Sequence, residues 1–104
     1  TLPPAHPDIA ISMEAIGGVL VKAGQPEEAE PVLRDALAIQ TESYAEGDPR
    51  IARVESILAR SLLYQGNRAE ARQLLEKSLP VLEEELGSDN IFTERAKEDL
   101  STLN

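Results

Sequence analysis

Apolar side chains recur at every third or fourth position over long stretches of this chain, which is the spacing of one face of an α-helix. Two such stretches contain Ile9, Met13, Ile16 and Leu20, and then Ile51, Leu58 and Leu62. Prolines and glycines separate the stretches, because proline favours the first position of a helix and glycine the residue just past its end. The pattern predicts helices over residues 7–23, 26–45, 49–65, 68–86 and 90–103.

Residues at the ends of these stretches support the predicted boundaries. Asp48 and Asn67 stand where N-cap residues are expected, and Gly24 and Gly66 stand where a helix would end. Pro31 and Pro80 fall inside two predicted helices. We expect both helices to stay continuous, because the apolar pattern resumes in phase after each proline.

The pattern repeats with a period of 42 residues, since GQPEEAEPVLRDAL at 24–37 aligns with GNRAEARQLLEKSL at 66–79. A fixed period of about 20–50 residues is typical of units that stack, because one unit cannot cover its own apolar face. We therefore expect a single domain over residues 1–104. Its parts are repeat 1 at 7–46, repeat 2 at 49–88, and a capping helix of an incomplete third repeat at 89–104.

The segment HPDIAISMEAIGGVLVKAGQPEEAEPVLRDALAI resembles a tetratricopeptide repeat, specifically the 42-residue variety similar to that of kinesin light chains. The resemblance rests on small residues beside large apolar ones at matching places: Ile16–Gly17 and Leu58–Ala59, then Ala29 and Ala71, then Leu33 and Leu75. It implies an all-α fold, an α-solenoid in which two helix-turn-helix hairpins and a capping helix form a right-handed superhelical stack. It also implies that the first helix of each hairpin lines a concave groove that receives a peptide or a partner helix.

By this resemblance, the groove would be lined by one face of the first helices and by the terminal helix. The candidate residues are Ile11, Glu14, Gly18, Val21, Lys22, Arg53, Ile57, Arg60, Tyr64 and Arg95. Four cations in this set would place positive charge inside a chain of net charge −9, which favours an acidic peptide or a carboxylate terminus. The alternative is that Arg53 and Arg60 pair with acids of neighbouring helices, namely Glu14 and Glu55 or Glu98.

Composition excludes several classes of function. The net charge of −9 argues against binding of nucleic acid. The sequence contains no run of 18 or more apolar residues, so it predicts no membrane-spanning helix. Without cysteine, disulfides and thiolate metal sites are excluded and a reducing interior is permitted, and we expect a cytoplasmic protein. The single histidine, His6, has no acid partner placed by the pattern, and the acids in 27–30 and 83–85 point in different directions. We expect no enzyme, no cofactor and no metal.

The first predicted helix is apolar nearly all round, and its charged residues are Asp8, Glu14 and Lys22. Such a helix is usually buried on more than one side. We therefore expect either a preceding repeat in a longer array, of which this chain is a fragment, or a homodimer formed through this helix. The last helix is polar on its outer side, as a capping helix requires.

The leading interpretation is a non-catalytic protein–protein interaction module that binds a peptide or partner segment in the concave groove. Two alternatives stay open. One is a self-association scaffold that dimerises through the apolar first helix. The other is a regulatory tetratricopeptide appendage of a larger signalling enzyme.

Overall fold

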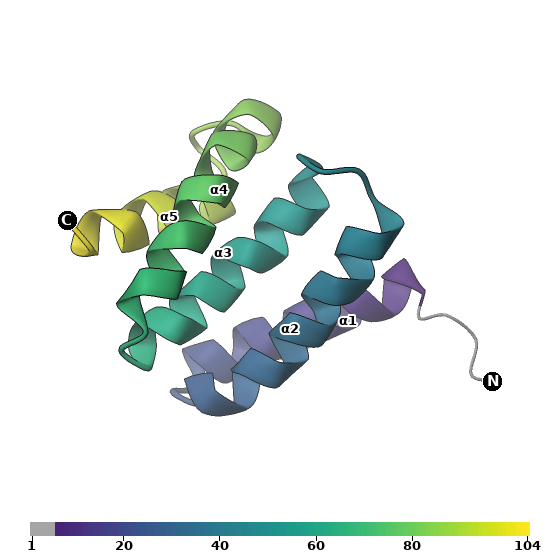
Figure 1. The fold of residues 1–104 in the computed structure, drawn as a ribbon, viewed down its shortest axis with the longest axis horizontal. Helices are drawn as coiled ribbons and strands as arrows, with labels where there is room; N and C mark the ends of the chain where they lie inside the picture. Colours follow the sequence, from purple (N-terminus) through teal and green to yellow (C-terminus); the bar gives the residue numbers. More distant parts are fainter. Residues whose placement is uncertain (1–5) are drawn as a thin grey trace.

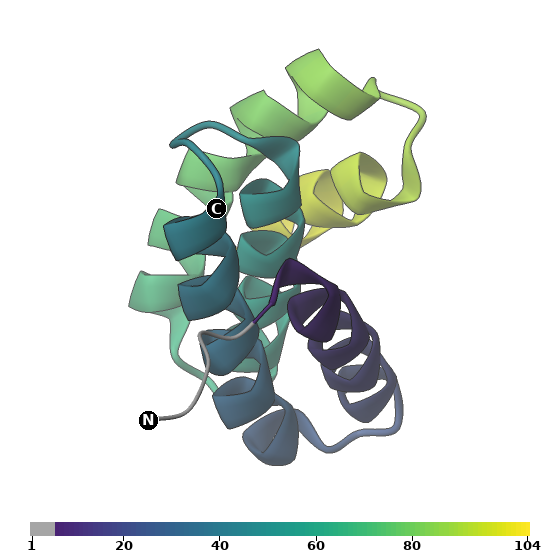
Figure 2. The same cartoon turned by 90° about the vertical axis from the view of Figure 1, so that its right-hand side faces the viewer.

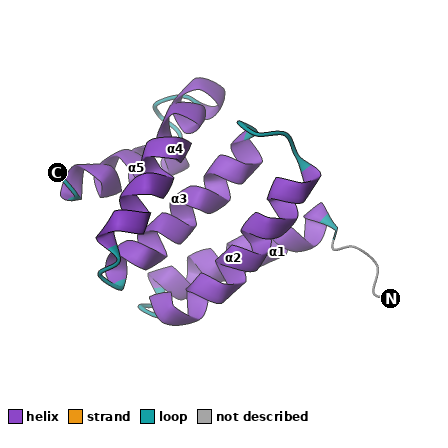
Figure 3. Cartoon of the chain, in the orientation of Figure 1, coloured by secondary structure: helices purple, strands orange, loops and turns teal. Residues whose placement is uncertain are grey.

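The computed structural model describes residues 6–104, and helices make up all the regular structure in this range (Figure 1; Figure 3). The helices are α1 (Pro7–Lys22), α2 (Pro26–Ser43), α3 (Pro49–Tyr64), α4 (Arg68–Leu86) and α5 (Ile91–Thr102). The five predicted helices are confirmed, each within two residues at its ends. Both α2 and α4 continue through their internal prolines, Pro31 and Pro80. None of the described helices is both long and apolar enough to cross a membrane.

Local chemistry sets the helix boundaries. The Asp48 side chain accepts a hydrogen bond from the backbone N–H two residues on, and the Asn67 side chain accepts one from three residues on. Each bond satisfies a donor that the first turn of a helix leaves free. Gly24 and Gly66 have φ values of 80° and 86°, which side chains disfavour, so the chain turns there between helices. These predicted caps and turns are confirmed.

The helices form two hairpins and a fifth helix in one stack. The first hairpin is α1 with α2, the second is α3 with α4, and α5 packs on α4 and α3. Because α3 also contacts α2 and α1, the two repeats are adjacent layers. In Figure 2, α1 and α5 lie to the right and α2 lies to the left, while α4 runs from the left of the stack up across its top. The fold is an all-α helical-repeat solenoid.

Small residues let the two helices of a hairpin approach closely. Gly17 of α1 faces Leu33 of α2, and a Cβ placed on Gly17 would lie 2.4 Å from Leu33 Cδ2. The corresponding pair one repeat later, Ala59 and Leu75, is fully buried. The small residues that the sequence places beside large apolar ones therefore lie in the core of each hairpin.

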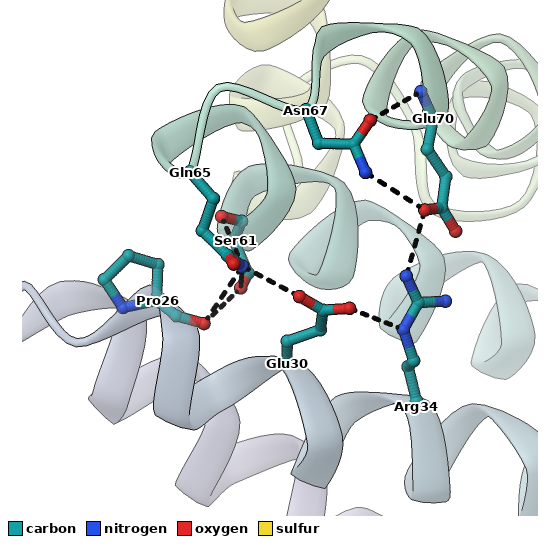
Figure 4. A network of polar contacts seen from close by, with 7 residues as sticks. All are labelled: Pro26, Glu30, Arg34, Ser61, Gln65, Asn67 and Glu70. Carbon is teal, nitrogen blue, oxygen red and sulfur yellow. Dashed lines mark hydrogen bonds and ion pairs between the residues drawn. The ribbon is translucent and has the colours of Figure 1, made fainter.

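A polar network joins the two hairpins near their glycine turns (Figure 4). The Ser61 hydroxyl of α3 donates to the backbone carbonyl of Pro26 in α2 at 2.6 Å. Arg34 of α2 donates from Nε to Glu30 at 2.8 Å and from Nη2 to Glu70 of α4 at 2.9 Å. The hydrogen bond from Arg34 lowers the pKa of Glu30 below its usual value. Helix α2 is thus bound to both helices of the second hairpin.

Candidate functional site

A cavity of about 560 Å³ opens between α1 and α3, which are the first helices of the two hairpins, and the fifth helix, α5. Its wall includes most of the residues predicted for the groove, namely Glu14, Gly18, Val21, Lys22, Ile57, Arg60, Tyr64 and Arg95. Two predicted residues, Ile11 and Arg53, do not line it. Ile11 lies on α1 and is 52% exposed. Ligand binding by any of these residues stays a prediction.

Sequence reasoning missed part of the wall that α5 supplies. Phe92 and Ala96 line the cavity together with Arg95 and Asp99. These four residues recur at intervals of three, one and three, so they share one face of α5. The helical spacing from Arg95 could therefore have identified Phe92 and Ala96 as wall residues, because it places them on the same face of α5.

Arg53 is held by an acid of the neighbouring hairpin. Its Nη2 donates to Glu14 Oε2 at 2.7 Å, and its guanidinium carbon lies 4.5 Å from the centre of the Phe92 ring. The Glu14 side chain is only 8% exposed, and burial raises its pKa while the charge of Arg53 opposes that rise. Arg53 therefore links α1, α3 and α5, and its charge is already paired.

Arg60 is paired as well. Its Nε lies 3.3 Å from Asp99 Oδ2 and its Nη2 lies 3.8 Å from Glu98 Oε1, both in α5. Asp99 is buried, which raises the pKa of its carboxyl, while the charge of Arg60 and, more weakly, that of Arg95 act to lower it. For both arginines the structure supports the interpretation of interhelical ion pairs. Of the two acids left open by the sequence, Glu98 lies near Arg60, whereas Glu55 pairs with Lys77 of α4 at 3.2 Å.

The cavity wall contains two more cations, Lys22 and Arg95, whose surroundings differ from those of Arg60. Both are exposed, and within residues 6–104 neither takes part in an ion pair. They come from α1 and α5, two helices that both contact α3 and do not contact each other. From α3 the wall includes Ile57 and the exposed Tyr64, and nothing lies within 4 Å of a Cβ placed on Gly18 of α1. The wall therefore combines two exposed cations outside any ion pair with apolar and aromatic side chains.

His6 and the acidic side chains are the groups whose chemistry bears on catalysis or metal binding. Over the described residues, no group of three or more histidine, aspartate or glutamate side chains gathers in a way that could hold a metal ion. His6 accepts a hydrogen bond on Nδ1 from the backbone N–H of Asp8 at 3.1 Å, so it caps α1. A second cavity of about 380 Å³ lies beside the α2–α3 loop and includes the Glu55–Lys77 pair.

The comparisons with known proteins agree with the fold. The tetratricopeptide repeat family model matches residues 9–50 and again residues 56–91. The first match spans 42 residues, the period found in the sequence, and the second runs from α3 to the first residue of α5. Among curated proteins, none matches this chain.

Proposed function

This chain belongs to the tetratricopeptide repeat family, and from that premise we propose that the cavity between α1, α3 and α5 binds an acidic segment of a partner protein. Repeats of this family are in general protein–protein interaction modules and not catalysts. The cavity wall here carries Ile57 and the exposed Tyr64 together with the exposed cations Lys22 and Arg95, and this wall would contact the ligand.

The observation that carries the proposal is the unpaired state of Lys22 and Arg95. The chain has a net charge of −9, and in the part that the structure describes Arg53 and Arg60 are neutralised by Glu14 and Asp99. Two cations left free in a cavity wall favour carboxylates, because hydrogen bonds between ionised groups are about twice as strong as neutral ones. Ile57 and Tyr64 would then contact apolar atoms of the bound segment.

The test compares charge reversals at the cavity cations with a matched charge reversal elsewhere on α5. Arg95→Glu should weaken binding of a fluorescent acidic peptide pool about tenfold or more, because a charge-assisted contact of about 1.5–3 kcal/mol is lost and repulsion is added. Lys22→Glu should act in the same direction. The matched control is Lys97→Glu, since Lys97 lies on the same helix but pairs with Glu83 and does not line the cavity.

Fluorescence anisotropy with acidic, amidated and basic peptide pools would measure these effects. Loss of affinity in the Lys97→Glu control equal to that in Arg95→Glu would reject the cavity as the site. Equal affinity for the acidic and basic pools would reject the proposed charge preference. If amidation of the peptide C-terminus abolishes binding, the carboxylate recognised is the terminal one.

A further inference from the structure

Helix α1 exposes an apolar stripe, which consists of Ile9, Ser12, Ile16 and Val19. Ile9 and Ile16 are each 52% exposed and Val19 is 66% exposed. The stripe positions are spaced by three, four and three residues, so they lie on one side of the helix. The buried residues of α1, which include the Gly17 that faces Leu33 of α2, lie on another side. Helix α2 therefore leaves the stripe uncovered.

The second repeat shows what covers this face when it is buried. The positions 42 residues further on are Ile51, Val54, Leu58 and Ser61, and they are all buried in α3. The cover is α2, because Val54 packs in one cluster with Ala36 of α2, and Ser61 donates a hydrogen bond to Pro26 of α2. The same face is thus buried in α3, where the second helix of the preceding hairpin covers it, and is left open in α1.

We infer that the α1 stripe is a docking face for the second helix of another tetratricopeptide hairpin, seated on α1 as α2 is seated on α3. The interface between α2 and α3 supplies the geometry, and Val19, which also lines the cavity, replaces Ser61 with an apolar contact. The described helices themselves cannot supply this partner from a second copy. The second helices of the two hairpins are already engaged, because α2 packs on α3 and α4 packs on α5.

A tandem duplication tests the inference within this chain. A copy of residues 7–48, which is one 42-residue period, is placed directly before Pro7 in place of residues 1–6. The new junction from Asp48 to Pro7 then repeats the natural junction from Asp48 to Pro49. Ile9→Lys and Ile16→Lys in the added copy give its outer face the polarity that terminal repeats need.

The duplicated protein should unfold in urea in one transition, with a higher midpoint than the parent and a larger m-value, because m grows with the surface that unfolding exposes. In the original α1, Ile16→Glu should lower the midpoint of the duplicated protein and leave the parent nearly unchanged. Ile11→Glu is the matched control, since Ile11 has the same 52% exposure but lies off the stripe. It should have equally small effects in both proteins.

Separate unfolding of the added hairpin, or an equal effect of Ile16→Glu in parent and duplicated protein, would overturn the inference. Sedimentation of the parent gives an independent test. A monomer is expected, because stripe-to-stripe pairing joins two chains that each carry a net charge of −9. A dimer that Ile16→Glu dissociates and Ile11→Glu leaves intact would assign the stripe to a second copy and overturn the inference.

Discussion

Arg53 Nη2 donates a hydrogen bond to Glu14 Oε2 at 2.7 Å, which joins the first helix of the second hairpin to the first helix of the first. Glu14 is the buried partner, with a side chain that is 8% exposed. A buried carboxylate that loses its partner keeps its desolvation penalty. The pair therefore contributes to how α1 is held on α3.

This pair predicts an asymmetric mutational response. Arg53→Met should lower the free energy of unfolding by about 1–3 kcal/mol, because it leaves Glu14 buried without a donor. Adding Glu14→Gln to Arg53→Met should recover much of the loss, because the unpaired charge is removed. Urea denaturation of both single variants and the double variant measures the coupling. Strictly additive effects would show that the two side chains do not act as a pair.

Two glutamates predict opposite dependences of stability on pH. Burial raises the pKa of Glu55 above its ordinary value of 4.5, so the folded state binds this proton more tightly than the unfolded state. The contribution of Glu55 to stability is then full below pH 4.5 and is lost as pH rises through its folded pKa. The hydrogen bond from Arg34 lowers the pKa of Glu30, so its contribution is present above pH 4.5 and is lost as pH falls through its folded pKa.

Glu55→Gln and Glu30→Gln measure these two slopes. As pH falls from 7 towards 4.5 and below, wild type should gain stability relative to Glu55→Gln and lose stability relative to Glu30→Gln. Thermal or urea unfolding at a series of pH values follows both differences. Slopes of the same sign for the two variants would contradict the assigned causes.

Much of the fold could be predicted from the sequence, because its determinants are local or periodic. Gly24 and Gly66 mark turns by their own backbone preference, and the 42-residue period places Ala59 where Gly17 stands one repeat earlier. The resemblance added which helix face forms the groove. Most of the predicted wall residues do line the cavity for this reason.

The charge pairing could not be predicted in full, because side chains choose partners only after the helices have packed. The sequence left open whether Arg53 lines the groove or pairs with Glu14, and only in the packed structure does its guanidinium turn to Glu14 and Phe92. Arg34 reaches Glu70 across the boundary between the hairpins, a contact that no local spacing encodes. The free cations of the wall were identified only when these pairs were known.

Neighbouring glycines in α1 predict opposite effects of the same substitution. Gly17→Ala should destabilise by about 1–3 kcal/mol, because the added Cβ would lie 2.4 Å from a core atom of Leu33 and 2.5 Å from its Cγ. Gly18→Ala should stabilise by about 1 kcal/mol, since nothing lies within 4 Å of its added Cβ and alanine favours the helix. The urea midpoints of the two variants give the comparison. A stable Gly17→Ala protein would mean that α1 and α2 approach less closely than described.

The open space at Gly18 also gives a test of the cavity that does not alter charge. Gly18→Leu should fill part of the cavity between α1 and α3 and reduce affinity for the acidic peptide pool, while the chain stays folded because leucine is a good helix former. Gly18→Ala adds only one carbon and should bind more tightly than Gly18→Leu. Circular dichroism establishes that both variants are folded, and anisotropy measures their binding. Unchanged affinity in a folded Gly18→Leu protein would place the binding surface elsewhere, because a ligand in the cavity must meet the new side chain.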